Sequence, residues 1–537
     1  MRELEIRNLL FKVEDFEHDY PFCWRCGTPL LYYAKNSWFI KMSAVNKELL
    51  ENNQKVNWVP EHIKEGRFGQ WLKESKDWAF SRERYWGTPL PIWECNQCDN
   101  KNTIGSIKEL EKLSIGSKNT YYVMRHGLTT RDELGVGTIS TRLENDTYHL
   151  TDEGRVGVER SLELLKLDDI DFIYASPFIR TQETAVIVGK ILHKEVKTDE
   201  RISEMSVGLA YEGKGQSVYT IEHKHSTMDS KSLDGESFND VRKRLMEFMV
   251  ELDIKYHNKK ILIVSHCDPL WLLNTMATGL EGDTILTNTN EAVWYPKLAE
   301  IHKLSWRKIP RNEYGELDLH RPFVDNIILK CAKCKSKMRK IPDLIDVWFD
   351  SGAMPYAQWH WPFENKKMFK EQFPADFIVE AMDQTRGWFY TLLAISTLLE
   401  KGAPYKNVMV LGHTLDLHGK KMSKSLGNTM LAIPAMEQYG ADTLRWYFFS
   451  MVSIGESKAV IPKEIEEKIK GFFGTLGNCV RFYELYGQGA EAFTHNSKAI
   501  NLLDKWILSK FNVLVGEVSD VLDKYDPTPT AKAIEKF

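Results

Sequence analysis

The sequence lacks the long apolar segments that membrane proteins need. No run among its 537 residues approaches the ~20 apolar residues of a membrane-spanning helix. The charged N-terminus lacks the apolar centre of a secretory signal. There is also no internal repeat and no low-complexity linker. These absences argue against a membrane protein and a repeat protein, and they predict a cytoplasmic location, where cysteines stay reduced.

The composition is that of a folded protein. Hydrophobic residues make up 43% of the chain and charged residues 27%, which predicts a packed core rather than disorder. The length suggests three or four domains of roughly 150 residues each. The net charge of −4 neither supports nor excludes a nucleic-acid partner, because Lys and Arg can gather on one face.

Cysteine is scarce, but its placement is informative. Six of the eight cysteines form three Cys-x-x-Cys pairs, which in a reducing compartment indicate metal binding rather than disulfides. The pairs are Cys23 with Cys26, Cys95 with Cys98, and Cys331 with Cys334. The unpaired Cys267 and Cys479 are expected to be buried as small apolar residues.

Short apolar runs that end in polar clusters predict an α/β fold. These runs are residues 121–124, 171–175, 261–264, 375–380 and 407–412. A helix is expected from Ile179 to about Leu192. In open α/β sheets ligands bind at the carboxyl ends of the strands, so the chemistry should lie there. From about Lys463 the pattern predicts amphipathic helices, with Pro527 and Pro529 marking a break.

A lysine-rich segment follows the last of these predicted strands. Lys421-Met422-Ser423-Lys424-Ser425 lies between Gly419 and Gly427. A mobile loop with two lysines can close on a triphosphate and stabilise the charge that builds on its phosphates. The alternative is a solvated basic loop without a ligand.

This loop resembles the KMSKS signature of class I aminoacyl-tRNA synthetases. Residues 77–95, 345–365 and 374–393 are similar to segments of the isoleucyl enzymes rather than their valyl or leucyl relatives. The resemblance covers essentially everything outside about residues 117–311. It implies ATP with Mg²⁺, isoleucine and tRNA(Ile) as substrates.

The resemblance also implies roles for individual residues. Lys421 and Lys424 would act on the ATP phosphates and Glu380 would contact the aminoacyl end of the adenylate. The remaining residues implied to shape the adenylate pocket are Asp383, Gln384 and Trp388. Core packing remains the alternative for Trp388, and a structural cap the alternative for the two carboxylates.

The sequence contains no HIGH-type motif, which class I enzymes also need. By the resemblance, the chain begins where the family leaves its editing domain and stops early in the helical anticodon-binding domain. We therefore expect half of the ATP site, the editing pocket and most of the tRNA-reading surface to be absent. A separate N-terminal synthetase half is a possible partner.

The family places a zinc knuckle where two of the cysteine pairs occur. The resemblance therefore implies Zn²⁺ held by Cys95, Cys98, Cys331 and Cys334, in a knuckle interrupted by the insertion. Four reduced structural cysteines remain the alternative. Cys23 and Cys26 resemble half of a second site whose partner pair is missing, so metal binding there stays open.

The insertion carries a second set of motifs. Arg125-His126-Gly127 is a weak signal alone, but Arg180 at a helix start, Glu204, an LDGESF segment and His266 at a strand end follow it in order. The set resembles the histidine phosphatase (phosphoglycerate mutase-like) superfamily over roughly residues 118–305.

That resemblance implies a reaction without a metal. The two arginines would clamp a phosphate monoester, and His126 would attack phosphorus to form phosphohistidine. His266 would stabilise the transferring group, while Glu204 would protonate the leaving oxygen and then activate water.

Two positions depart from the superfamily pattern. Leu128 stands where many mutases have Glu, and Cys267 stands where Gly commonly follows the second histidine. Leu128 favours phosphatase over mutase activity. The identity of the phosphate monoester cannot be read from the sequence.

The predicted architecture is a class I nucleotide-binding (Rossmann-like) half-fold with an α/β phosphatase inserted into its zinc knuckle. The predicted domains are a segment following the editing domain (1–94), the two knuckle halves (95–116 and 312–340), the insertion (117–311), the C-terminal half of the nucleotide-binding domain (341–462) and the start of a helical anticodon-binding bundle (463–537). Three functions stay open: part of a tRNA ligase, a phosphatase whose flanks serve as an RNA-binding or structural mount, and a non-catalytic interaction module.

Overall fold

The computed structural model describes most of the chain in two compact units. One unit comprises residues 82–351, and the other comprises residues 1–81 with 352–537. The described residues are 2–537, except 16, 18–19, 24–25, 116–117, 134–146, 166–168, 212–213, 215–226, 280–285, 287–293, 308, 424–426 and 488–500. Every helix within these ranges is too short or too polar to span a bilayer.

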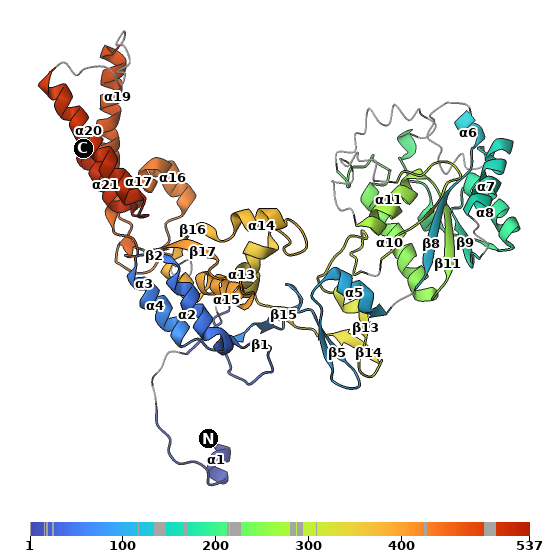
Figure 1. The fold of residues 1–537 in the computed structure, drawn as a ribbon, viewed down its shortest axis with the longest axis horizontal. Coiled ribbons are helices and arrows are strands. Elements are labelled where there is room, and N and C mark those ends of the chain that lie inside the picture. Colours follow the sequence, from blue (N-terminus) through green and yellow to red (C-terminus); the bar gives the residue numbers. More distant parts are fainter. Residues whose placement is uncertain are drawn as a thin grey trace. The chain divides into compact units, whose positions relative to one another are not determined.

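A five-stranded sheet forms the centre of the inserted region (Figure 1). Its order is β10-β9-β11-β8-β12. The strands are β8 (Thr120–Arg125), β9 (Phe172–Ala175), β10 (Val196–Thr198), β11 (Lys260–Ser265) and β12 (Ile301–Lys303). Of the five, only β12 runs antiparallel to its neighbour. The three apolar runs predicted as strands here are confirmed.

Helices cover both faces of this sheet (Figure 1). They are α7 (Asp152–Leu165), α8 (Ile179–Leu192), α10 (Phe238–Lys255) and α11 (Cys267–Thr278), with the short α6 (Thr130–Glu133) near the β8 end. Along β11, Ile261 and Ile263 share an apolar cluster with residues of α10 and α11, whereas Leu262 and Val264 share one with residues of α7 and α8. Successive side chains of a strand point to opposite faces, so a doubly covered strand is apolar throughout.

The second sheet of this unit is assembled from both sides of the insertion. Its order is β6-β5-β14-β13-β7. The elements are β5 (Ile92–Cys95), β6 (Lys101–Thr103), α5 (Ile107–Leu113) and β7 (Ser114–Ile115) before the insertion, and β13 (Ile328–Lys330) and β14 (Lys337–Lys340) after it. β5 pairs with β14, and β7 pairs with β13. The buried Trp93 ties the two parts further, because its Nε1 donates to the Ile327 carbonyl at 2.8 Å.

The other unit contains a three-stranded parallel sheet. Its order is β16 (Ala375–Ala381), β17 (Tyr405–Leu411) and β2 (Asn57–Val59), so the apolar runs at 375–380 and 407–412 are confirmed as strands. The helices α2 (Asn46–Gln54), α4 (Arg67–Lys73) and α15 (Trp388–Leu398) contribute to one buried core with Trp58 and Val408.

The remaining short elements lie in this unit or close in sequence to the points where the two units divide. They are α1 (Arg2–Ile6), β1 (Phe39–Ile40), α3 (His62–Glu65), β3 (Trp78–Ala79), β4 (Ser81–Arg82), β15 (Leu344–Ile345), α13 (Val347–Ala357), α14 (Lys366–Gln372), β18 (Thr414–Leu415) and β19 (Lys458–Ala459).

The C-terminal part is helical, as predicted. The helices are α16 (Ala432–Tyr439), α17 (Ala441–Met451), α18 (Pro462–Lys468), α19 (Gly474–Tyr486), α20 (Leu502–Leu522) and α21 (Pro527–Lys536). The predicted break is confirmed, because α20 ends at Leu522 and α21 begins at Pro527. Pro529 lies within the first turn of α21, where a missing N–H is tolerated.

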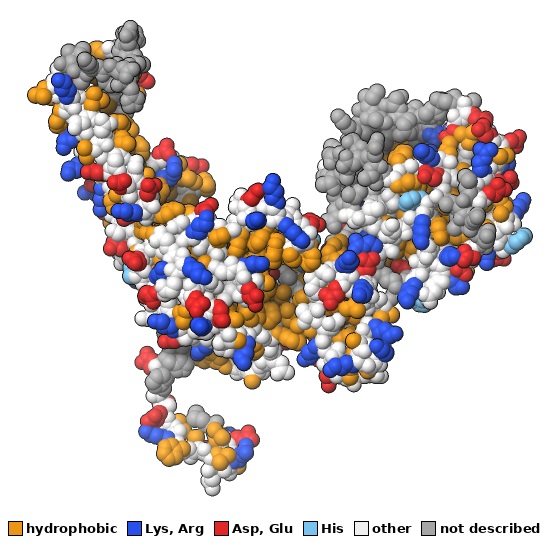
Figure 2. Space-filling view, in the orientation of Figure 1, with side chains coloured by type: hydrophobic (Ala, Val, Ile, Leu, Met, Phe, Trp, Pro, Cys, Tyr) orange, Lys and Arg blue, Asp and Glu red, His pale blue; other side chains and the backbone are white. Residues whose placement is uncertain are grey.

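The expectation that Cys479 is buried was also wrong. Cys479 is exposed on α19, a helix without any buried residue. Apolar side chains are exposed over α16 as well, namely Ile433 and Met436, and Figure 2 shows hydrophobic surface there.

Candidate functional site

The pairing of β8 with β11 places two histidines next to each other. Arg125 and Ser265 are register partners at the carboxyl ends of these parallel strands. The next residue of each strand is therefore a neighbour, and the His126 backbone N–H donates to the Ser265 carbonyl at 3.1 Å. The ring centroids of His126 and His266 lie 5.5 Å apart.

His126 is held in a defined protonation state. Its Nδ1 lies 2.9 Å from the Gly127 carbonyl, which can only accept, so Nδ1 carries the proton and Nε2 keeps its lone pair. Burial lowers the pKa of His126 well below 6.5, and the charges of Arg180 and Arg125 lower it further. A buried, neutral imidazole with a free lone pair is the form that can act as a nucleophile.

His266 is also buried and neutral. Burial, followed by the charge of Arg180, lowers its pKa well below 6.5. Its Nε2 lies 2.8 Å from Ser176 Oγ. When this hydroxyl donates, the ring proton is on Nδ1, which has no hydrogen-bond partner among the described residues.

Two arginines give the site its positive charge. Arg125 ends β8, and its Nη1 donates to the Pro296 carbonyl at 3.0 Å. Arg180 lies in the first turn of α8 and is only 2% exposed. Its guanidinium lies 4.8 Å from the Phe178 ring centre, and burial lowers its pKa to about 10, so it remains charged at neutral pH.

Glu204 faces the second histidine. Its Oε2 lies 4.0 Å from His266 Nδ1, and its Oε1 accepts from the Met205 backbone N–H at 3.0 Å. Burial raises the pKa of Glu204, although Arg180 and the Met205 N–H oppose this shift. A carboxyl group with a raised pKa holds its proton longer and suits a general acid.

The structure adds three polar residues to this site that the sequence did not single out. Ser176 contacts His266, and Thr184 Oγ1 accepts from the Gly127 N–H at 3.1 Å. Burial, followed by the charge of Glu204, raises the pKa of Asp268 to about 7. Asp268 lies two residues after His266, in the first turn of α11. Only this closeness to His266 in the sequence could have identified it.

Four cysteines converge at the sheet that closes across the insertion. The cluster consists of Cys95, Cys98, Cys331 and Cys334, and their sulfur atoms all lie within 4.8 Å of one another. Cys95 Sγ is 3.4 Å from Cys334 Sγ, and Cys98 Sγ is 3.6 Å from Cys331 Sγ. Sulfurs around a tetrahedral zinc with bonds of about 2.3 Å would be about 3.8 Å apart, so the cluster fits a metal.

Cys23 and Cys26 make local contacts with the residues that follow them. The Gly27 N–H donates to the Cys23 carbonyl at 2.8 Å, and Cys26 Sγ lies 3.1 Å from Thr28 Oγ1. The contacts with Thr28 lower the pKa of Cys26 to about 7. Within the described part of the chain no third ligand joins this pair.

The lysine-rich loop borders a cavity of about 600 Å³. Lys421 and Met422 line it with Gly412, His413 and residues of α16 and α17. The residues on the two sides of the loop are joined, because Asn428 Nδ2 donates to Asp416 Oδ2 at 2.7 Å. Lys424 lies outside the described residues.

The other residues assigned to the adenylate pocket follow β16. Glu380 is exposed near its carboxyl end, and Asp383 and Gln384 lie on the following 3₁₀ turn. Gln384 Oε1 accepts from the N–H of Trp388, the first residue of α15, at 2.9 Å. The Trp388 side chain packs against the core around Trp58. Core packing was the alternative to a role in the adenylate pocket.

Comparison with known proteins agrees with this division of the chain. A family model for class I tRNA synthetases (I, L, M and V) matches residues 3–139 and 284–459. A model for the histidine phosphatase superfamily (branch 1) matches residues 121–302.

Curated relatives are isoleucine–tRNA ligases. Those of Clostridium tetani and Dehalococcoides mccartyi are each 31% identical, over 99% and 100% of this chain, and the matches cover 33% and 34% of the relatives. The chain thus spans about a third of their length. Among solved structures, Bacillus stearothermophilus YhfR is 22% identical, with 37% of this chain and 98% of that chain covered and a TM-score of 0.31.

The synthetase model covers more than half of the chain, on both sides of the phosphatase match. This chain therefore belongs to the class I tRNA synthetase family (I, L, M and V), and it carries a histidine phosphatase domain as an insertion.

Proposed function

We propose that the inserted domain hydrolyses phosphate monoesters through a phosphohistidine, and that the flanking segments form part of an isoleucine–tRNA ligase. One observation supports the phosphatase proposal above all others. Arg125, His126, Arg180, Glu204 and His266 come from four segments of the chain, and contacts and charge interactions link them into one group around the two buried histidines.

The proposed reaction has two steps. The Nε2 lone pair of neutral His126 attacks phosphorus, the bond to the leaving oxygen breaks, and that oxygen takes the proton of Glu204. Water then attacks the phosphohistidine and gives a proton to the Glu204 carboxylate, while the phosphorus–nitrogen bond breaks and phosphate leaves. Arg125, Arg180 and His266 stabilise the negative oxygens throughout.

The ligase proposal rests on the relatives and on the lysine-rich loop. Isoleucine, ATP with Mg²⁺ and tRNA(Ile) would be the substrates. Lys421 at the cavity edge and Lys424 would contact the ATP phosphates, and Glu380, Asp383 and Gln384 would lie at the adenylate. The helices from Pro462 onward would begin the anticodon-binding domain. A cytoplasmic location remains a prediction.

A separate N-terminal half would complete this synthetase site. Among the described strands, β16 pairs only with β17 and leaves its other edge open. Phe377 and Val379 on β16 are 40% and 39% exposed. An open edge with exposed apolar side chains can accept a further strand, which supports a partner polypeptide at this position.

The four-cysteine cluster would hold one zinc ion. Thiolates are the ligands that structural zinc prefers, and four of them give a closed site without catalytic chemistry. Such an ion would fix β5 to the turn between β13 and β14, on either side of the insertion. Cys23 and Cys26 provide only two ligands, and metal binding there is left to experiment.

Replacement of the proposed nucleophile should abolish hydrolysis. The purified chain should hydrolyse a generic phosphate monoester without added metal, and His126→Ala should lower the rate at least about a thousandfold, since the proposed route forms the phosphohistidine on His126. His257→Ala, at an exposed position of the same domain, should retain activity. Undiminished turnover by His126→Ala would refute the phosphohistidine route.

The pH dependence of hydrolysis should reflect the two shifted groups. His126 reacts when neutral, and its lowered pKa keeps it neutral as the pH falls below 6.5. Glu204 donates when protonated, and its raised pKa keeps the proton above pH 4.5. For an alkyl phosphate, kcat/KM should therefore be highest under mildly acidic conditions and fall as the pH rises through the Glu204 pKa.

Glu204→Gln tests the origin of this fall. An amide does not titrate and cannot donate the proton, so the variant should be slower. Its kcat/KM should still fall with rising pH where the substrate phosphate ionises, but the fall caused by Glu204 should be lost. An identical pH profile in the variant and the parent chain would assign the fall to another group.

Metal analysis should find about one zinc per chain, bound by the four-cysteine cluster. Cys331→Ser should lose the metal and increase hydrogen exchange in β5 and β14, because zinc binding and folding of such a site are coupled. The matched control is Cys479→Ser, an exposed cysteine outside the cluster. Full zinc content in Cys331→Ser would contradict this assignment.

The chain alone should not catalyse isoleucine-dependent ATP–pyrophosphate exchange. The loop lysines would stabilise the charge that develops on the ATP phosphates from one side. The sequence has no HIGH-type motif to stabilise this charge from the other side. Exchange should appear after addition of a separately produced N-terminal half, and it should then require Lys424. Lys406→Ala, an exposed lysine on β17, is the control. Exchange by the chain alone would overturn this proposal.

A further inference from the structure

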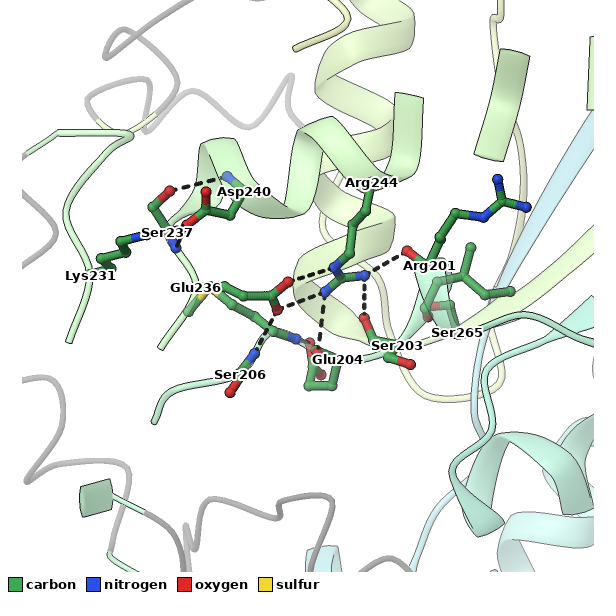
Figure 3. Close-up of polar contacts among 12 residues, drawn as sticks. Arg201, Ser203, Glu204, Ser206, Lys231, Glu236, Ser237, Asp240, Arg244 and Ser265 are labelled. Atoms are coloured by element: carbon green, nitrogen blue, oxygen red, sulfur yellow. Dashed lines mark hydrogen bonds and ion pairs between the residues drawn. The ribbon is translucent and has the colours of Figure 1, made fainter. Parts of the chain in front are cut away.

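The LDGESF segment, residues 233–238, has no part in the phosphoryl-transfer steps above, yet it packs against the loop that carries Glu204. The two are joined by Arg244 on α10, whose side chain reaches back to both (Figure 3). These contacts hold the backbone on either side of the Glu204 side chain.

Arg244 uses every one of its N–H groups. Nε and Nη2 donate to the two carboxylate oxygens of Glu236 at 2.8 and 3.0 Å. Nη1 donates to the carbonyls of Arg201 and Ser203 at 2.6 and 2.9 Å, and Nη2 donates to the carbonyl of Glu204 at 3.3 Å. A guanidinium has five N–H donors in a fixed fork, so these five bonds leave none unused.

Glu236 holds the same loop from the other direction. Its Oε2 accepts from the Ser206 N–H at 2.9 Å, and its own N–H donates to the Ser206 carbonyl at 2.7 Å. The preceding Gly235 allows this approach, because a Cβ there would lie 3.0 Å from the Ser206 carbonyl oxygen and 2.3 Å from Ser232 Oγ.

A third contact comes from the strand that leads to His266. Ser265 Oγ donates to the Ile202 carbonyl at 2.6 Å. The loop from Arg201 to Ser206 is therefore held on one side by Arg244 with Glu236 and on the other by the end of β11. Glu204 lies between these attachments, with its Oε2 4.0 Å from His266 Nδ1.

We propose that Arg244 and Glu236 are positioning residues for the general acid Glu204. Arg244 fixes the backbone on both sides of Glu204, and Glu236 fixes the guanidinium, so the pair keeps the carboxyl within reach of the leaving oxygen. Lysine could not replace Arg244, because an ammonium is a compact charge without the planar fork. This inference rests on the proposed phosphatase function.

Leaving groups of different basicity test the proposal. Glycerol 3-phosphate needs a proton from Glu204 as its alkoxide leaves, whereas 4-nitrophenolate leaves readily without one. Because general acid catalysis contributes about 10²–10⁴-fold, Arg244→Met should lower kcat/KM for glycerol 3-phosphate at least about tenfold and for 4-nitrophenyl phosphate less than about threefold. Arg244→Lys should show the same selective loss, as should Glu204→Gln.

The ratio of the two kcat/KM values does not depend on the fraction of protein that is folded. If Arg244→Met does not fold, the ratio can be measured in Glu236→Gln instead. This variant loses one carboxylate acceptor and the negative charge that hold Arg244. Arg201→Met is the matched control, since its side chain pairs with Asp199 and Glu251, both at 2.7 Å, and its ratio should be unchanged.

The outcomes distinguish the positioning role from the phosphatase function. Equal losses on both substrates in the Arg244 variants, or full activity on both, would overturn the positioning role while the phosphatase function stands. A parent chain that hydrolyses neither substrate would overturn the phosphatase function itself. Restoration of the parent ratio by Arg244→Lys would show that charge alone is required and would also contradict the proposal.

Discussion

The parallel pairing of β8 with β11 is the constraint on which the rest of the phosphatase site depends. Its register brings Arg125 opposite Ser265 and hence His126 beside His266, without any direct bond between the two rings. A slip by one residue would turn every side chain of one strand to the opposite face. Because both faces of β11 are buried under helices, such a slip would exchange the residues of its two buried clusters, so the position of the reactive groups is tied to the packing of the whole domain.

The same packing determines the chemistry of these groups. Burial disfavours the charged form of each group. It therefore lowers the pKa of both histidines and raises the pKa of Glu204. The charges of Arg125 and Arg180 lower the pKa of the histidines further and oppose the rise in the pKa of Glu204. A site with two permanent cations and two neutral histidines favours an anionic ligand, and the phosphate itself then provides negative charge.

Much of this arrangement could be predicted from the sequence, and the reasons are local. The strands were visible as apolar runs, the helix Ile179–Leu192 has the bounds expected of it, and the motif residues are close in sequence to strand ends. Ser176 and Arg244 were not identified, since their partners lie 90 and up to 43 residues away and depend on how the helices pack. The exposure of Cys479 was missed for a similar reason, because residue type does not reveal whether a helix has a neighbour.

The interrupted sheet has a consequence for the order of folding. Cys98 and Cys331 are 233 positions apart in the chain, yet their sulfurs lie 3.6 Å apart. Closing so long a loop from an unfolded chain is entropically unfavourable, and the cost rises with the logarithm of the loop length. Once the intervening domain has folded, only the short segments around it remain flexible, and the closure becomes easier by about 1–2 kcal/mol. The cysteine sheet is thus formed most readily after the domain within it, although its first strands are synthesised earlier.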